Sequence, residues 1–354
     1  MLLGHAWDAT MEGFYKEKVA GGKLMSVKIV YDEFIESVEI RGDFFIYPEE
    51  SLPAIEKSIC GHNVRDAESA IAADIESLAS KEGIEFVGIS PEAIARAVKN
   101  AIMSNIKWRV LPLASYPAAM NMGIDCAIME AVRAGASAPT MRFYTWKNDS
   151  VSIGRFQCME EEVDVKECNA TGVDCVRRMT GGGAVYHDSS GEITYSIITP
   201  EAYFPKGIRE SYMEICGYVM RGLLFLGIEP EFAPINDILA NGRKISGNAQ
   251  TRSRGVILQH GTILYNVDLK KMFSILKVSK EKISDKRIGS AEERVTSVLK
   301  ERPGTSMEEL YNAVLQGFVE GKSVEYGRFS KEEEARASEL AEKVYKSSDW
   351  NFSR

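Results

Sequence analysis

The chain has 354 residues, a formal net charge of −8 and a sequence pI of about 5.4. Its 45% hydrophobic and 27% charged residues are typical of a globular chain and argue against a disordered one, and its length suits about two or three domains. The acidic balance argues against broad binding to nucleic acids or anionic membranes, because both need a basic surface. It remains compatible with a small anionic ligand held by a few local cations.

The cysteines and the apolar runs indicate a cytoplasmic protein. The six cysteines form no CxxC pair, which argues against a zinc ribbon or a thioredoxin-like site. They are sparse for a disulfide scaffold and indicate a reducing compartment. No uninterrupted apolar run reaches the roughly 18 residues needed to span a bilayer. The first residues lack a basic segment followed by an apolar one, so we expect no signal peptide and no membrane association.

The N-terminal part predicts a small β-meander followed by helices. Residues 24–47 alternate between apolar and polar side chains, which favours antiparallel strands joined by turns. Ser90 and Pro91 suit the N-cap and the first residue of a helix, and apolar residues then recur at helical spacing. We therefore expect a compact domain over residues 1–106.

The remaining residues, 107–354, are expected to form a second domain with an α+β fold. Strand-like and helical segments are mixed along it: strands at 108–113, 141–146, 151–157, 173–179 and 255–267, and helices at 120–131 and 209–227. Asn241-Gly242 predicts a type I′ hairpin turn. Capping boxes at Ser306/Glu309 and Ser330/Glu333 predict the starts of the last two helices. The expected architecture is a mixed, mostly antiparallel sheet with helices packed against it.

Residues 177–188, RRMTGGGAVYHD, form the most unusual segment. Three consecutive glycines let backbone N–H groups approach a ligand without interference from Cβ atoms, and such loops bind phosphate. The arginines can add bidentate contacts to an anion. The segment is not a Walker A loop, because no Lys-Ser or Lys-Thr follows it. A plain tight turn at the end of a strand is the alternative interpretation.

The segment 236–250, NDILANGRKISGNAQ, forms the second constellation. Strand alternation is expected to put Lys244 and Ser246 on one face, with Asp237 across the hairpin. A lysine in this position is either a solvated edge residue or a point charge that binds a phosphate. The third constellation is LQHGTIL: two of the four histidines, His187 and His260, fall beside glycines, which makes a weak case for a metal site.

Taken in order, these motifs resemble the lipoate–protein ligase family, which shares a fold with biotin ligases. RRMTGGGAVYHD (177–188), NDILANGRKISG (236–247) and HGTIL (260–264) carry the similarity, together with 277–298 and the closing YKSSDWNF. It extends over roughly residues 107–354. Residues 12–106 resemble the small accessory domain of these ligases, which in many members follows the catalytic domain or is a separate polypeptide. The resemblance implies an accessory domain at 1–106 that is needed for adenylation, fused before the catalytic domain at 107–354.

The resemblance also implies a reaction. Lipoate or octanoate would be activated with ATP and Mg²⁺ to an acyl-AMP, and the acyl group would then pass to one lysine of a lipoyl acceptor domain. That acceptor would be of the 2-oxoacid dehydrogenase E2 type or the glycine-cleavage H protein type.

The site residues follow from the motif match. Lys244 would contact the α-phosphate and the acyl oxygen, Arg178 would meet phosphate or carboxylate, and Asp237 would contribute to the Mg²⁺ site. The other expected binding residues are Gly181, Gly182, Gly183, Ala184, Val185, His187, Asn236, Ser246, Gly247, His260 and Gly261. This chain has Asp125-Cys126 where the family usually shows Asp-Glu, on a helix expected mainly to pack.

Three rival functions stay open. An octanoyl or lipoyl transferase of the same fold uses a cysteine thioester in place of ATP, but neither GIEPEFAPIND (227–237) nor YNVDLKKMF (265–273) has the cysteine that such transferases carry there. A non-catalytic binding module would not need both Lys244 and Arg178. A biotin ligase would show a GRG-type loop in place of RRMTGGGAVYHD.

Overall fold

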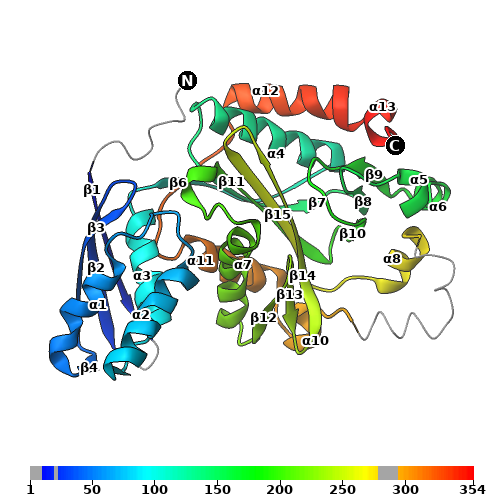
Figure 1. The fold of residues 1–354 in the computed structure, drawn as a ribbon. Coiled ribbons are helices and arrows are strands. Elements are labelled where there is room, and N and C mark those ends of the chain that lie inside the picture. The colour runs from blue at the N-terminus through cyan, green and yellow to red at the C-terminus, as the bar shows by residue number, and fades with distance from the viewer. Residues whose placement is uncertain (1–9, 20–22, 278–293) are drawn as a thin grey trace. The chain divides into compact units, whose positions relative to one another are not determined.

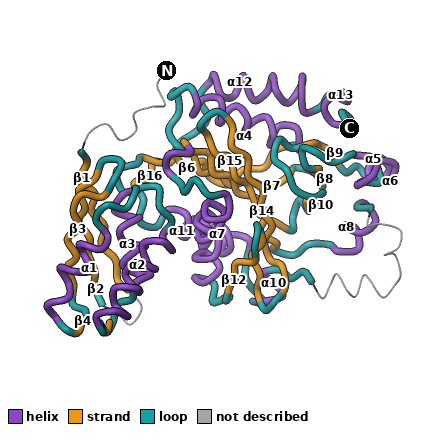
Figure 2. Tube along the Cα trace, in the orientation of Figure 1, coloured by secondary structure: helices purple, strands orange, loops and turns teal. Residues whose placement is uncertain are grey.

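The computed structural model describes residues 10–19, 23–277 and 294–354. They divide into two compact units: the first holds the residues up to Trp108 together with Glu201–Glu214 and Val319–Glu325, and the second holds the rest. Figures 1 and 2 show the elements of both units. No helix in the described ranges has the length and apolar character needed to cross a membrane.

The first unit is built on the predicted meander. Its strands β1, β2 and β3 pair antiparallel in that order, and β4 pairs with β5. The bounds are β1 Met11–Lys18, β2 Leu24–Tyr31, β3 Ile35–Gly42, β4 Phe45–Tyr47, β5 Glu85–Val87, α1 Leu52–Ile59, α2 Glu68–Glu82 and α3 Pro91–Met103. Alternate residues of β2 are fully buried, which agrees with the pattern expected of a half-exposed sheet. Ser90 accepts from the Ala93 amide at 3.2 Å and so confirms the predicted N-cap of α3.

The second unit contains a large mixed sheet. Within this unit the strand order is β12-β13-β14-β15-β11-β7-β6, and β6 and β7 are parallel while β7, β11, β15, β14, β13 and β12 pair antiparallel. The bounds are β6 Lys107–Tyr116, β7 Thr140–Trp146, β11 Glu192–Pro200, β12 Pro230–Ala233, β13 Asp237–Ala240, β14 Arg243–Ser253 and β15 Val256–Leu264. A further strand, β16 (Ser323–Tyr326), falls largely in the segment Val319–Glu325 of the first unit. The predicted α+β class with a mostly antiparallel sheet is confirmed.

Helices cover both faces of this sheet. On one face α4 packs on β7, β11 and β15, and α12 packs on α4 so closely that a Cβ at Gly123 would lie 2.5 Å from the Ala337 carbonyl oxygen. On the other face an aromatic cluster joins α7 and α11 to the sheet through Tyr218, Phe318 and Tyr195. The bounds are α4 Ala118–Arg133, α7 Ile208–Phe225, α8 Leu269–Ile275, α10 Val298–Glu301, α11 Met307–Val319, α12 Lys331–Leu340 and α13 Ser348–Asn351, with a π-helical turn at Ala341–Tyr345.

A small second sheet carries the glycine segment. Strand β8 (Ser150–Ile153) lies between β9 (Asp174–Arg177) and β10 (Val185–His187), and the three glycines form the loop from β9 to β10. The short helices α5 (Met159–Glu162) and α6 (Val165–Thr171) lie between β8 and β9 in sequence. The sheet thereby fixes both ends of the loop, because β10 and β9 are bonded to the same central strand.

The local signals read from the sequence are largely confirmed. Asn241 and Gly242 have φ of 49° and 71°, as a type I′ turn requires. Both capping boxes are present, with Ser306 and Ser330 each accepting from the amide of the glutamate three residues on at 3.1 Å. Most of the predicted family segment 277–298 lies outside the described residues.

Candidate active site

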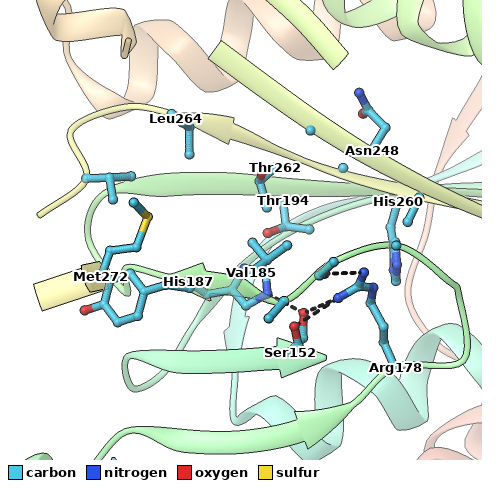
Figure 3. Close-up of a pocket in the computed structure, with 18 of the residues that line it drawn as sticks. Ser152, Arg178, Val185, His187, Thr194, Asn248, His260, Thr262, Leu264 and Met272 are labelled. Atoms are coloured by element: carbon cyan, nitrogen blue, oxygen red, sulfur yellow. Dashed lines mark hydrogen bonds between the residues drawn. The ribbon is translucent and has the colours of Figure 1, made fainter. Parts of the chain in front are cut away.

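A cavity in the second unit collects most of the residues that the sequence predicted. It is bounded by the glycine loop, β10, β14, β15 and α8 (Figure 3). Of the fourteen predicted site residues, Gly181, Asp237 and Ser246 do not line it, and these eleven do: Arg178, Gly182, Gly183, Ala184, Val185, His187, Asn236, Lys244, Gly247, His260 and Gly261.

The guanidinium of Arg178 is hydrogen-bonded to the glycine loop. Its Nη2 donates to the carbonyl oxygens of Gly181 and Gly183 at 2.7 and 2.8 Å, and its Nε donates to Thr180 Oγ1 at 3.1 Å. Its Nη1 donates to the backbone oxygen and to the hydroxyl of Ser152 at 2.9 and 3.2 Å. These five bonds match the five N–H groups of a guanidinium. In this arrangement Arg178 acts on the loop, and its contact with a phosphate or carboxylate stays a prediction.

The neighbouring Arg177 has a different role. It is fully buried, and its guanidinium donates to the backbone oxygens of Gln157, Trp350 and Asn351 at 2.6, 2.9 and 3.0 Å. Arg177 therefore holds the C-terminal α13 against β9. Of the two arginines in the motif, Arg177 serves packing and Arg178 sets the geometry of the loop.

Two glycines of the loop are constrained in different ways. Gly182 has a φ of 94°, and a Cβ there would lie 2.9 Å from Arg178 Nη2, so a side chain would strain the backbone and disturb the arginine. Gly183 lines the cavity, and a Cβ there would meet no atom within 4 Å. A side chain at Gly183 would therefore reduce the space for a ligand and leave the loop intact.

Lys244 lies on β14 at the polar end of the cavity, with its side chain 40% exposed. Its Nζ forms an ion pair with Asp237 Oδ1 across the hairpin at 2.7 Å, as the sequence suggested. A Cβ at Gly247 would lie 2.7 Å from Lys244 Nζ, so the absence of a side chain at 247 makes room for the ammonium group.

The expectation that Lys244 and Ser246 share a face is wrong. The pairing of β13 with β14 shifts between Ile238 and Leu239, so that Ile238 pairs with Ser246 and Leu239 pairs with Lys244. Such a bulge inserts one residue and reverses the alternation. Gly247 consequently shares the cavity side with Lys244, whereas Ser246 is fully buried and its hydroxyl has no hydrogen-bond partner among the described residues.

Two asparagines join the hairpin to the central strands. Asn248 Nδ2 donates to the Asn236 carbonyl oxygen at 2.8 Å, and Asn248 Oδ1 accepts from Tyr195 at 2.6 Å. A Cβ at Gly261 would lie 1.9 Å from Asn248 Oδ1, so Gly261 is required for this contact. Asn236 and Asn248 thus present polar atoms to the cavity from fixed positions.

A buried network links His260 to the helix α4. His260 Nε2 lies 2.7 Å from Thr180 Oγ1, and its Nδ1 lies 3.5 Å from Asp125 Oδ2. Asp125 Oδ1 accepts from Arg142 and from Ser196 at 2.7 and 2.8 Å. Burial lowers the pKa of His260, although Asp125 acts in the opposite direction; burial raises the pKa of Asp125, but Arg142 and His260 outweigh it and leave it lowered. The helix was expected mainly to pack, and this network shows that it also holds a cavity residue in place.

His187 belongs to a second network. Its Nε2 lies 2.8 Å from Ser152 Oγ, and its Nδ1 lies 2.8 Å from Glu192 Oε1. The ring stacks on Trp146, with centroids 3.9 Å apart and an interplanar angle of 18°. Both nitrogens of this cavity residue are therefore engaged by side chains from β8 and β11.

The opposite end of the cavity is apolar. Met272 and Leu264 point into it in Figure 3, away from Arg178 and His260. Val267, Leu269 and Leu276 complete this wall, which comes from the end of β15 and from α8. An apolar chain with a polar or charged head would match such a cavity.

None of the six cysteines lines the cavity. Cys216 is fully buried against Gln259 of β15, and burial raises its pKa to about 12. Burial raises the pKa of Cys126 as well. The thiols at these positions are consequently protonated at neutral pH and poor nucleophiles.

Within the described ranges, no group of three or more His, Cys, Asp or Glu side chains is arranged to hold a metal ion. Asp237 is the one predicted metal ligand, and its carboxylate is paired with Lys244. Mg²⁺ commonly takes one or two carboxylates and completes its shell with water and substrate phosphates, so a single carboxylate is compatible with that use.

Several cavity residues were missed by the reading of the sequence. Ser152, Trp146 and Thr194 line the cavity, and the carboxylates of Asp125 and Glu192 lie behind it. A serine or tryptophan in a strand gives no functional signal by itself. An acidic residue that opens an apolar strand, as Glu192 does in EITYSII, gives at most a weak signal.

The sequence of this chain is similar to those of known proteins. Residues 117–319 match the family described as lipoyl protein ligase A/B catalytic domain. An octanoyltransferase LipM from Geobacillus kaustophilus is 33% identical over 280 residues, covering 71% of this chain and all of the relative. Another LipM, from Clostridioides difficile, is 34% identical and covers 70% of this chain and 99% of the relative.

The structure of this chain is also similar to solved structures. A bi-partite lipoate protein ligase from Thermoplasma acidophilum, described with its E2 lipoyl domain, matches with a TM-score of 0.64 and 33% identity, over 70% of this chain and 97% of the other. A lipoate-protein ligase A bound with ATP matches with a TM-score of 0.61 and 30% identity, over 70% of this chain and 99% of the other. The curated relatives are thus named as transferases and the solved relatives as ligases.

Proposed function

The chain belongs to the lipoyl protein ligase A/B catalytic domain family, and we propose that it is an ATP-dependent lipoate–protein ligase. Free lipoate or octanoate would be joined to AMP with release of pyrophosphate, and the acyl group would then be transferred to a lysine of an acceptor domain. This proposal names one of the two activities found among the relatives.

The observation that carries it is the absence of any cysteine from the cavity. A transferase that works through a cysteine thioester needs a reactive thiol beside the acyl group. A ligase needs none, because ATP supplies the activation. The ATP-bound structure of a relative at 30% identity adds support for the nucleotide.

Each end of the cavity has a role in this proposal. The apolar wall around Met272 and Leu264 would hold the acyl chain, and Lys244 would approach the carboxylate and the α-phosphate. Two anions repel, so a cation between them both binds them and stabilises the charge that develops during the reaction. Asn236 and Asn248 would add neutral hydrogen-bonding groups on the same side.

Mg²⁺ would be bound through Asp237 and the nucleotide phosphates. When bound, the ion supplies charge neutralisation on the phosphates. Asp237 would keep Lys244 aligned, because the two side chains are already paired at 2.7 Å.

Residues 1–106 are proposed to act as the accessory part of the ligase. The Thermoplasma relative is bi-partite, and residues 12–106 resemble an accessory domain. The acceptor is proposed to be a lipoyl domain, since that relative is described with its E2 lipoyl domain.

An octanoyltransferase is the second candidate, and the names of the curated relatives favour it. The two are separated by the acyl source. With purified chain, a lipoyl domain and free octanoate, a ligase modifies the domain only when ATP is present. A cysteine-dependent transferase leaves free octanoate unused with or without ATP and forms an acyl-cysteine from an octanoyl thioester.

A further inference from the structure

Three side chains beside the cavity form a hydrogen-bonded triad: Ser152, His187 and Glu192. Ser152 Oγ lies 2.8 Å from His187 Nε2, and His187 Nδ1 lies 2.8 Å from Glu192 Oε1. Figure 3 shows Ser152 between Arg178 and His187 at the cavity wall. These are the separations expected of a nucleophile, a general base and an orienting carboxylate.

The donors and acceptors fix the direction of the hydrogen bonds. Arg178 Nη1 donates to Ser152 Oγ at 3.2 Å, and an arginine cannot accept. A carboxylate accepts only, so in the neutral tautomer of His187 that donates to Glu192 the proton lies on Nδ1 and Nε2 carries the lone pair. The hydroxyl proton of Ser152 therefore points at Nε2, which is the arrangement that lets a histidine remove it.

Glu192 holds the ring from behind. It is fully buried, and its Oε1 also accepts from Trp146 Nε1 and Thr194 Oγ1, each at 2.9 Å. Its Oε2 has no hydrogen-bond partner among the described residues. Burying a carboxylate with one oxygen unpaired costs free energy. The cost is explained if the charge serves to stabilise an imidazolium, because Trp146 already holds the ring plane by stacking.

We propose that Ser152 is a nucleophile that takes an acyl group from a thioester without ATP. Its Oγ forms a bond to the acyl carbon while the proton passes to His187 Nε2. The C–S bond breaks, and the leaving thiolate receives that proton. The amine of an acceptor lysine or a water molecule then attacks the ester and gives a proton to His187 Nε2. The C–O bond breaks, and His187 returns that proton to Ser152 Oγ, which regenerates the serine.

Other parts of the cavity suit this step. Gly182 and Gly183 line the cavity, and within the described part of the chain neither backbone N–H donates to a backbone acceptor, so the loop could supply donors to a developing oxyanion. The proposal rests on the acyl pocket of the proposed function but not on ATP. It also gives this chain a route to the chemistry of its transferase-named relatives without their cysteine.

The test exposes the intact chain to octanoyl-coenzyme A without ATP, followed by an acid quench and peptide mass spectrometry. We expect one octanoyl group on Ser152. Ser152→Ala should lose this octanoyl group. Ser150→Ala is the control and should keep it, because Ser150 lies on the same strand but does not line the cavity, and its hydroxyl donates to the Asn148 carbonyl oxygen at 2.8 Å. Ser152→Cys should be acylated, and its thioester should be cleaved by neutral hydroxylamine.

Glu192→Gln tests the orienting role. It keeps the shape of the side chain and removes the charge, so acylation of Ser152 should slow by about 10²-fold or more. Its pH–rate profile should shift as well, which a purely structural change would not produce.

Formation of octanoyl-AMP from free octanoate and ATP, measured on the same preparations, separates the two proposals. Adenylate formation with no acyl-Ser152 overturns the serine proposal and leaves the ligase proposal standing. Acyl-Ser152 with no adenylate does the reverse. Acylation of a cysteine overturns the serine proposal and supports the cysteine-dependent transferase. If Ser152→Ala fails to fold, the position of the octanoyl group in the peptide mass spectrum of the wild-type chain still decides the question, because acylation at any residue other than Ser152 contradicts the proposal.

Discussion

Lys244 is the cation best placed to act on a bound anion. It lines the cavity, and Asp237 holds its ammonium group at 2.7 Å. We expect Lys244→Ala to lower the rates of both acyl-AMP formation and acyl transfer by about 10²–10³, because charge builds on the oxygens beside the same atom in both steps. Lys244→Arg should restore little, since a planar fork does not replace a compact ammonium group.

The neighbouring Arg243 provides the control for that experiment. It lies on the same strand, pairs with Glu301 at 2.8 Å and does not line the cavity. Arg243→Ala should therefore retain both rates. Wild-type rates for Lys244→Ala in pyrophosphate exchange and in transfer from supplied acyl-AMP would show that Lys244 is only a solvated hairpin residue.

Substitutions at Gly182 and Gly183 are expected to impair the protein in different ways. Gly182→Val should lower both stability and activity, because the residue has a φ of 94° and its Cβ would crowd Arg178. Gly183→Val should fold normally and bind acyl substrates more weakly, since its Cβ would enter open space in the cavity. Thermal unfolding and substrate KM of the two variants distinguish them. Equal losses of stability would contradict this division of roles.

Helix α8 supplies much of the apolar wall, and one carboxylate anchors it. Asp149 pairs with Lys271 of α8 and accepts from Tyr186 and the Ser189 amide, each at 2.9 Å. Burial raises the pKa of Asp149, but these partners outweigh it and lower the pKa to about 2. Because the folded value lies below the ordinary value of about 3.9, the anchor stabilises the fold fully above pH ~3.9. The stabilisation is lost as the pH falls toward 2.

We expect Asp149→Asn to raise the KM for lipoate several-fold with a smaller effect on kcat, because the helix bearing Leu269 and Met272 is held less firmly. The variant should also lose the part of acid stability that falls between pH ~4 and ~2. Asp174→Asn is the control, since Asp174 is a nearby acidic residue whose carboxylate accepts from Asn148 Nδ2 at 3.4 Å. An unchanged KM and an unchanged acid-unfolding curve would show that this ion pair does not anchor α8.

Elements with local signals were predictable from the sequence, and contacts between elements were not. The hairpin turn at Asn241-Gly242, the cap at Ser90 and both capping boxes depend on a few adjacent residues. The bulge beside Ile238 has no comparable signal, and a single inserted residue was enough to misplace Ser246.

The candidate site was likewise predictable only where its residues belong to local motifs. The ordered motifs located most of the cavity lining because each motif sits on one loop or strand end. The bonds of Arg178 to the glycine loop were not predicted. The contacts of Asp125 with His260 and of Glu192 with His187 were not predicted either, because they join elements that are separate in the sequence. Such pairings become visible only when the sheet order is known.

At the scale of the whole chain, residues 1–106 are proposed to support activation more than transfer. We expect a chain truncated to begin at Lys107 to transfer from supplied lipoyl-AMP but to form lipoyl-AMP poorly. Retained transfer also shows that the truncated chain folds. Adding residues 1–106 as a separate polypeptide should restore activation. Equal rates of complete ligation with and without these residues would remove the accessory role.

The central claim is that this chain activates a free carboxylic acid with ATP, and isotope exchange between pyrophosphate and ATP measures that step alone. With the intact chain and Mg²⁺, we predict exchange that depends on added lipoate or octanoate and is absent with biotin, and that falls by about 10²–10³ in Lys244→Ala. No exchange with either acid, from a chain that remains folded, would contradict the ligase assignment.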